Sequence, residues 1–224
     1  MELREVTYTA VVIRILASIL FGGIIGLERG MKNRPAGLRT YMLVCMGSCL
    51  IMLTNQYMFQ CTQTGDPGRF GAQVVSGIGF LGAGTIVVTK HNQIKGLTTA
   101  AGLWAAAGVG LALGVGFYEA AVVSGVSIYV ILSILQRWDN KVRNKTRFIE
   151  IYVEIAEGTN LSTFIHTLRE LDFEIRNIQL ERESGIEEGT HTLTATLKAP
   201  KRFDHVQLSE KIRKIDGVVY LEEL

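Results

Sequence analysis

Hydrophobic residues fill long stretches in the first part of the chain, whereas they alternate with polar residues in the last third. No Asp, Glu, Lys or Arg occurs between Arg69 and Lys90 or between Lys95 and Glu119, while charges are frequent after Arg137. A membrane-spanning helix needs about 20 predominantly apolar residues. The pattern therefore predicts a membrane part, followed by a soluble part that begins near Arg137.

Five apolar stretches are long enough to cross a bilayer as helices. We predict membrane spans at residues 7–27, 38–59, 71–89, 98–116 and 117–135. The last two are nearly contiguous, so a tight glycine-rich turn must separate them; one long broken helix, which would give four spans, is the alternative. The first stretch is followed by charged residues rather than by a small-residue cleavage site, which predicts a retained span.

Basic residues are concentrated in every second loop of this five-span arrangement. The loops after the first, third and fifth spans hold nearly all of them: Arg29, Lys32, Arg34, Arg39, Lys90, Lys95, Arg137, Lys141, Arg143, Lys145 and Arg147. The other side holds only Arg4 and Arg69. Because cytoplasmic loops carry an excess of Lys and Arg, we predict that the N-terminus lies outside and the C-terminal part lies in the cytoplasm.

The third predicted span contains three glycines, Gly77, Gly79 and Gly82, that match the dinucleotide-binding fingerprint G-x-G-x-x-G. That fingerprint requires a preceding strand and an acidic residue about 20 positions later. No Asp or Glu occurs between Asp66 and Glu119. We therefore interpret these glycines as packing positions, because small residues let helix backbones approach closely within a membrane.

Small residues occur on several faces of the third span, which predicts a helix with neighbours on most sides, central to the bundle. They recur at every fourth position of the fourth span. The predicted packing seam consists of Gly77, Gly79, Gly82, Gly84, Gly102, Ala106 and Gly110. The two helices could pack against each other, against a second copy of the chain, or both.

Ionisable residues inside a membrane are costly, and they mark candidate functional sites. Arg14 lies well inside the first span. It either extends its side chain to the outer interface or forms a buried pair with Asp66 or Glu119, in a network that Gln73 could join. Asp66 is also expected to cap a helix and to pair with Arg69, with ion binding as the alternative.

Glu28 and Arg29 end the first span. They form either a solvated helix end or an ion-pair cluster in which Glu28 binds Arg34 or Arg39. The candidate functional polar cluster is therefore Arg14, Glu28, Arg29, Arg39, Asp66, Arg69 and Gln73.

Other chemistry finds little support in the sequence. The carboxylates of the membrane part are few and lie on opposite sides in this topology, a poor set of ligands for a magnesium path, since Mg²⁺ prefers an octahedron of oxygen atoms. We interpret Cys45 and Cys49 as packing residues. The sequence contains neither a phosphate loop of the form G-x-x-x-x-G-K-S/T nor a G-x-S-x-G elbow, and it shows no nucleophile–base motif. We expect neither enzyme activity nor a cofactor.

From residue 148 onward the pattern predicts a small α+β domain. The segment F-I-E-I-Y-V-E-I-A alternates as a half-buried strand does, and a helix, a strand with a bulge near Arg176 and Asn177, a strand, a helix and a strand follow. This βαββαβ order is that of the ferredoxin-like fold. We thus predict three regions: a membrane domain at 1–136, a basic linker at 137–147 and a cytoplasmic domain at 148–224.

Five segments of the membrane part form an ordered series. They are G-L-E-R at 26–29, P-A-G-L-R-T at 35–40, D-P-G-R at 66–69, A-Q-V-V-S-G-I-G-F-L-G-A-G at 72–84 and K-G-L-T-T-A-A at 95–101. Together they resemble the MgtC/SapB family of bacterial membrane proteins. The C-terminal part is similar to the ACT-like domain that some members carry.

The resemblance implies a multi-pass inner-membrane protein linked to low magnesium, to survival inside host cells and to virulence. It implies a regulator that contacts other membrane proteins, such as the rotary ATP synthase. The small-residue seams, together with the lack of an evident transport path, predict that this regulator acts as a homo-oligomer. A transporter or channel for Mg²⁺ or another small solute is the alternative. We expect the ACT-like domain to dimerise, because its sheet edges are free, or else to bind a small ligand near residues 157–160. Lipid is an expected partner, and nucleic acid is not.

Overall fold

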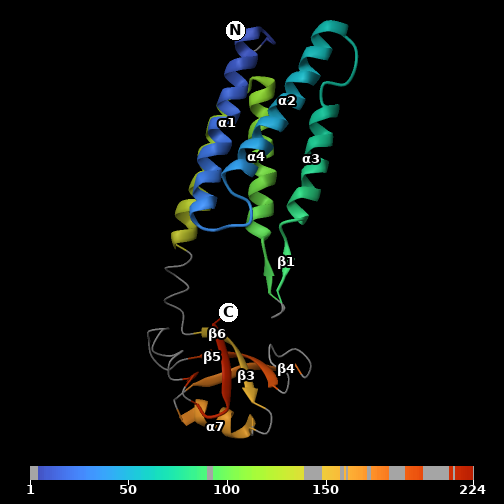
Figure 1. Ribbon diagram of the computed structural model, residues 1–224. Coiled ribbons are helices and arrows are strands. Elements are labelled where there is room, and N and C mark those ends of the chain that lie inside the picture. The colour runs from blue at the N-terminus through green and yellow to red at the C-terminus, as the bar shows by residue number, and fades with distance from the viewer. Residues whose placement is uncertain are drawn as a thin grey trace. The chain divides into compact units, whose positions relative to one another are not determined.

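The computed structural model describes residues 5–89, 93–138, 148–156, 159, 161–170, 173–181, 190–198, 212–213 and 215–223. These residues fall into two compact units, a bundle of helices from the first part of the chain and a small sheet from the last part (Figure 1). The predicted basic linker, apart from Arg137 and Trp138, lies outside the described residues.

Helices build the first unit. They are α1 (Tyr8–Met31), α2 (Leu38–Thr62), α3 (Arg69–Ala83), α4 (Leu97–Val115), α5 (Tyr118–Val130) and the π-helix η2 (Ile131–Leu135), which continues α5. Within the described residues, four stretches are long and apolar enough to cross a membrane: α1, α2, α4 and the continuous helix Tyr118–Trp138. Gly116 ends α4 at a φ of +83°. The last two predicted spans are therefore separate helices, joined by a tight turn.

The third predicted span is where the structure departs from the sequence prediction. α3 contains 15 residues, which at the α-helical rise make about 22 Å, less than the roughly 30 Å of a bilayer core. After Gly84, β1 (Val87–Val88) pairs with β2 (Ile94–Lys95) in an antiparallel ribbon. The prediction of helix through residue 89 is wrong at its C-terminal end, where β-branched residues favour a strand.

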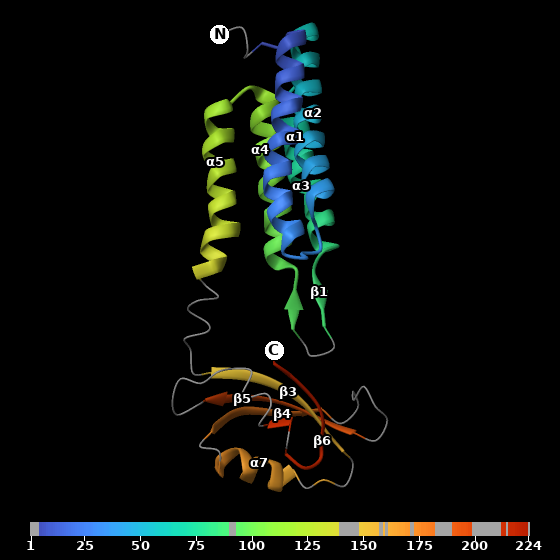
Figure 2. The same cartoon turned by 60° about the vertical axis from the view of Figure 1, so that its left-hand side comes forward.

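α4 occupies the centre of the helical unit, in contact with α1, α2, α3 and α5. Figure 2 shows α5 on one side of α4 and α1 on the other. Glycines let the α4 backbone approach α2: a Cβ atom at Gly114 would lie 2.7 Å from the Cys49 carbonyl oxygen, and one at Gly110 would meet the Cys45 carbonyl oxygen. Ala106, between them and the start of the helix, is fully buried. The glycines are thus required for α4 to pack against α2.

Two glycines of α1 make the same kind of contact with α2. A Cβ atom at Gly22 would lie 2.6 Å from the Tyr41 carbonyl oxygen, and one at Gly26 would lie 2.8 Å from the Leu38 Cα atom. Both distances are shorter than non-bonded atoms tolerate. Only glycine therefore fits where α1 and α2 meet.

α3 lies at the edge of the helical unit, with Ile78 and Gly82 as its only buried residues. Gly82 packs against α4, where an added Cβ atom would lie 3.4 Å from the Ala100 Cβ atom. Gly77 and Gly79 face open space, with nothing within 4 Å of the position that a Cβ atom would take. The prediction that this helix is central is wrong, because small residues permit a close approach without causing one.

The second unit is a four-stranded antiparallel sheet with a helix. Its elements are β3 (Phe148–Ala156), α7 (Leu161–Glu170), β4 (Glu174–Glu181), β5 (Thr190–Lys198) and β6 (Val218–Glu223). The strand order is β4-β5-β3-β6. The predicted bulge is confirmed, since the register shifts between Arg176 and Gln179 and Asn177 has a φ of +48°. Most of the second predicted helix lies outside the described residues.

One face of β3 forms the core of the sheet unit. It packs against α7 and β5 through Ile149, Ile151, Val153, Ile155, Phe164, Leu168, Leu193, Ala195 and Leu197. The other face was predicted to be exposed, but Tyr152 and Glu154 are 2% and 1% exposed. The Tyr152 hydroxyl donates to Glu154 Oε1 over 2.9 Å, and its ring meets that of Tyr220 edge-on at 6.3 Å. The strand is therefore covered on both faces at these positions.

We expect Gly110→Ala to lower the unfolding temperature of the purified protein in detergent. The added methyl group would meet the Cys45 carbonyl oxygen, and such overpacking costs roughly 1–3 kcal/mol. Gly108→Ala is the matched control on the same helix, because nothing lies within 4 Å of its Cβ position. It should raise the unfolding temperature slightly, since Ala favours a helix over Gly by about 1 kcal/mol. Thermal unfolding followed by size-exclusion chromatography measures both unfolding temperatures. Equal changes for the two variants would contradict the close contact of Gly110 with α2.

Candidate functional site: two buried arginines on the first helix

α1 carries two buried arginines, Arg14 and Arg29, whose side chains are 0% and 2% exposed. They lie on the buried face of the helix, together with Ala10, Ser18, Gly22 and Gly26. Residues spaced by three and four positions share one face of a helix. The glycines between the two arginines bring α1 against α2, and the arginines extend into the bundle at the two ends of this contact.

Arg14 is surrounded by polar partners near the start of α1. Its Nε atom donates to the Tyr118 hydroxyl at 3.2 Å, and Nη1 donates to Gln56 Oε1 at 2.8 Å and to the Gly114 carbonyl at 2.7 Å. Nη2 donates to the Glu5 carbonyl at 3.3 Å. The Tyr118 ring adds a cation–π contact, with its centroid 6.0 Å from the guanidinium carbon.

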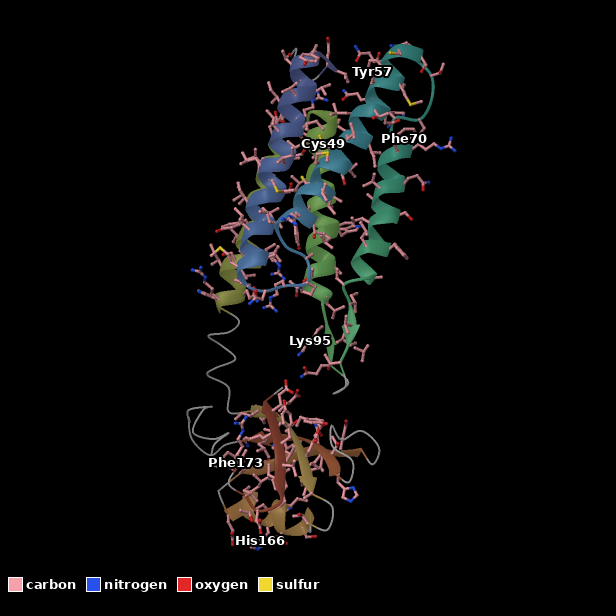
Figure 3. The ribbon with its side chains drawn as sticks, in the orientation of Figure 1. Cys49, Tyr57, Phe70, Lys95, His166 and Phe173 are labelled. Atoms are coloured by element: carbon pink, nitrogen blue, oxygen red, sulfur yellow. The ribbon has the colours of Figure 1, made fainter. Side chains whose placement is uncertain are left out.

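Through these hydrogen bonds Arg14 supplies a donor to the C-terminal end of α4. The last carbonyls of a helix lack partners within it and carry partial negative charge, and the Gly114 carbonyl belongs to this group. The backbone of Arg14 is also engaged, because Cys49 Sγ of α2 lies 3.6 Å from its carbonyl oxygen. Figure 3 shows Cys49 inside the helical unit. Arg14 thus joins α1 to α2, α4 and α5 and does not extend to the solvent.

Arg29 lies at the other end of α1, beside the start of α4. Its Nη2 atom donates to Thr99 Oγ1 at 3.3 Å, and its Nη1 atom lies 3.9 Å from Glu28 Oε2. The Tyr41 hydroxyl donates to the Thr99 carbonyl at 3.5 Å. A Cβ atom at Gly102 would collide with that hydroxyl, so the glycine makes room for Tyr41 between α2 and α4.

Lys32 connects this cluster to η2. It forms an ion pair with Glu28 Oε1, which is four residues earlier on α1. Its Nζ atom also donates to Gln136 Oε1 at 2.9 Å and to the Leu132 carbonyl at 3.3 Å. Leu132 belongs to η2, and π-helical turns are frequent at functional sites. Lys32 therefore holds the end of α1 to the end of the last helix.

The structure places the remaining predicted residues on the surface. Arg39, Asp66, Arg69 and Gln73 are exposed. Asp66 accepts a hydrogen bond from the Gly68 amide at 2.8 Å, which organises the turn before α3. The prediction that Asp66 caps a helix is wrong, because α3 has Gly68 as its N-cap and no side chain caps it. Glu28 binds Lys32, whereas the predicted partners Arg34 and Arg39 are exposed.

Sequence reasoning missed most of the partners that complete the two arginine sites. These are Tyr41, Gln56, Thr99, Tyr118 and Gln136. They come from helices distant in sequence, so no spacing rule identifies them. Lys32 could have been found, because Glu and Lys four residues apart meet on a helix surface.

The helical unit also has an apolar groove between α2 and α3. It has a volume of about 560 Å³, and it is lined by Leu43, Val44, Gly47, Ser48, Ile51, Phe70, Gln73, Val74, Gly77, Ile78 and Leu81. Gly77 of the predicted packing seam therefore faces this groove instead of another helix of the same chain. Gln73 supplies the only amide among its lining side chains.

The sheet unit holds an exposed charged group at the edge of β4. Glu174 binds Lys198 Nζ at 2.7 Å and the Arg176 guanidinium at 2.6 Å. The hydrogen bond from Lys198, and then that from Arg176, lower the pKa of the Glu174 carboxyl below its usual range. Because such surface pairs are screened by water, they contribute little to stability. We therefore assign this cluster no functional role.

Comparison with known proteins gives a consistent picture. The family described as the MgtC family matches residues 15–141. A putative magnesium transporter YhiD from Escherichia coli is 39% identical over 156 residues, which cover 67% of this chain and 71% of that protein. Protein SapB from Bacillus subtilis is 30% identical over 217 residues, 93% of each chain. Protein MgtC from Salmonella typhimurium is 46% identical over 93 residues, 42% of this chain and 38% of that protein. No solved structure matches the chain.

We expect Arg14→Leu to destabilise the helical unit. It removes the donor from the buried Gly114 carbonyl, and a buried polar group that loses its partner costs roughly 1–3 kcal/mol. Arg14→Lys should lower the unfolding free energy less than Arg14→Leu does, because it keeps a cation near the end of α4. Arg69→Leu, an exposed arginine, is the control and should change the unfolding free energy by about 0.5 kcal/mol or less. Thermal unfolding in detergent measures all three, and equal losses for Arg14→Leu and Arg69→Leu would contradict the site.

Proposed function

This chain belongs to the MgtC family, and on that premise we propose that it is an integral regulatory protein of the bacterial inner membrane. It serves adaptation to low magnesium or survival inside host cells. It acts by forming homo-oligomers and by contacting other membrane proteins, such as the ATP synthase. It has no enzymatic activity of its own.

The hydrogen bonds and ion pairs that Arg14 and Glu28 make within the helical unit carry this proposal. Arg14 donates to acceptors from three other parts of the helical unit, and Glu28 is held by Lys32. A conduction path for a cation needs oxygen ligands that exchange their partners as the ion passes. A carboxylate held by a lysine and polar groups that close a helix end serve structure instead, which supports a regulator.

A transporter is the second candidate, and a specific observation favours it. The relative YhiD, 39% identical over 156 residues, is named a putative magnesium transporter. The groove between α2 and α3 would then belong to the transport path, with Gln73 as its polar lining residue.

We further propose a five-pass topology with the N-terminus outside and the C-terminal unit in the cytoplasm. α3 and the turn residues up to β1 together make the third pass, which the distribution of basic residues supports. The strand order β4-β5-β3-β6, with α7 between β3 and β4, supports a ferredoxin-like, ACT-like domain. This domain dimerises through a free sheet edge. The alternative ligand site at 157–160 falls on residues of which the structure describes only Thr159.

The regulator and the transporter predict different results in vesicles. Inverted membranes from cells that express the chain should show weaker ATP-driven proton pumping than membranes from cells without it, because the chain restrains the ATP synthase. Proteoliposomes that contain the purified chain and an internal magnesium indicator should take up Mg²⁺ no faster than protein-free liposomes. Unchanged pumping together with magnesium entry would reverse the assignment.

The topology predicts where a reporter attached after Leu224 is active. With five passes, green fluorescent protein at this position folds in the cytoplasm and fluoresces, while alkaline phosphatase at the same position stays inactive. If α3 does not cross the membrane, the reporter lies on the other side and the two signals exchange. A second fusion after Thr64, in the loop between α2 and α3, is the control and should give the opposite pair of signals.

A further inference from the structure

Positive charge is in excess where the end of α1 meets the start of α4. Arg29 and Lys32 lie there with Glu28, which is the only acidic residue between Val6 and Gly65. Arg29 is 2% exposed, and the side chains of Glu28 and Lys32 are 10% and 27% exposed. Two cations therefore share one carboxylate in a largely buried place, where unbalanced charge is costly.

The guanidinium of Arg29 uses little of its hydrogen-bonding capacity. A guanidinium has five N–H donors, yet in the described part of the chain the well-formed side-chain hydrogen bond of Arg29 is that to Thr99 at 3.3 Å. Among the described residues, its Nε and Nη1 atoms have no hydrogen-bond partner. Glu28 Oε2, at 3.9 Å from Nη1, is too distant for one. The Tyr41 hydroxyl also interacts with the guanidinium as a hydrogen-bonding group, but it is neutral and cannot balance the charge.

This guanidinium lies at the N-terminus of α4, where a cation is unfavourable. Thr99 is the third residue of the 19-residue helix, and Gly96 before it offers no side chain to cap it. The first N–H groups of a helix lack partners within it and carry partial positive charge, so they attract anions. The C-terminal end of α1 offers little compensation, because the Arg29 carbonyl already accepts from the amides of Lys32 and Arg34.

We propose that Arg29 and the first turn of α4 form a binding site for a phosphate group. An anion here would accept hydrogen bonds from the two unused nitrogen atoms of Arg29 and from the first backbone amides of α4. It would also balance the excess positive charge. A phosphate fits better than a halide, because its several oxygens can reach donors on both helices at once. The phosphate belongs either to a free anion or to the headgroup of an anionic lipid, and both present the same chemistry to these residues.

A pocket lies near the cluster, although neither Arg29 nor Thr99 lines it. It has a volume of about 370 Å³ and reaches α4 at Leu103, one helical turn after Thr99. Ala36 and Thr40 line it from the start of α2 and the loop before it. Phe80 also lines it and is 84% exposed, so the pocket opens at the surface of the helical unit. This site is independent of whether the chain regulates or transports.

Thermal unfolding of the full chain in two lipid conditions tests the site. In the first, the protein is in uncharged detergent, and inorganic phosphate is titrated against sodium chloride of matched ionic strength. In the second, phosphate-free protein is placed in nanodiscs of phosphatidylcholine with increasing phosphatidylglycerol. We expect the unfolding temperature to rise by about 4 °C once a ligand exceeds its dissociation constant tenfold. A rise in one arm alone identifies the source of the phosphate.

Arg29→Gln should abolish this rise, and Thr99→Val should reduce it. Arg39→Gln, an exposed arginine in the first turn of α2, is the matched control and should keep the full rise. Without ligand, Arg29→Gln should unfold no lower than the wild type, because it removes a buried charge that shares its only nearby carboxylate among the described residues, Glu28, with Lys32. If Arg29→Gln does not fold, Thr99→Val against Thr99→Ser, which keeps the hydroxyl, carries the test.

Three results would overturn the proposal. One is the absence of a rise in both arms, and another is an equal rise with chloride. The third is a rise in Arg29→Gln as large as in the wild type. A purely structural Arg29 would instead lower the unfolding temperature of Arg29→Gln by the same amount with and without ligand.

Discussion

The rest of the helical unit depends on the close contact that α2 makes with α1 and α4. Glycines at Gly22 and Gly26 of α1, and at Gly110 and Gly114 of α4, remove the side chains that would keep these backbones apart. Once the three helices are this close, side chains of α1 can reach the ends of α4. Packing of small residues, rather than the hydrophobic effect, drives helix association in lipid, so this contact also supplies much of the stability of the unit.

The two arginines on α1 meet opposite ends of α4, and their surroundings differ for that reason. Arg14 lies at the C-terminus of α4, where a cation is favourable, and it is bonded to four acceptors. Arg29 lies at the N-terminus, where a cation is unfavourable, and two of its nitrogens lack acceptors among the described residues. The first arrangement is complete within the chain. The second one has unused donors and excess positive charge, which is the chemistry of an anion-binding site.

The sequence predicted the features that depend on one segment of the chain. It did not predict those that depend on which other helices or strands pack against that segment. Charge-free stretches located the helices, Gly116 separated α4 from α5, and a change of alternation located the bulge near Asn177. The place of α3 was predicted wrongly, because small residues show which faces could pack and not what packs there. Likewise, the spacing around Arg14 gave no sign of Gln56 or Tyr118, since both come from other helices. The burial of Tyr152 and Glu154 escaped prediction for the same reason, because it depends on what covers the strand.

Lys32 connects the cluster of Glu28, Arg29 and Lys32 to the end of the last helix. Glu28 lies between two cations, close enough to pair with Lys32 and 3.9 Å from Arg29. An anion at Arg29 would balance the positive charge of Arg29. Glu28 would then pair with Lys32 alone. Lys32 in turn holds Gln136 and the Leu132 carbonyl at the end of the last helix. Because these groups share one carboxylate, the occupancy of Arg29 and the hold on the last helix are electrostatically coupled.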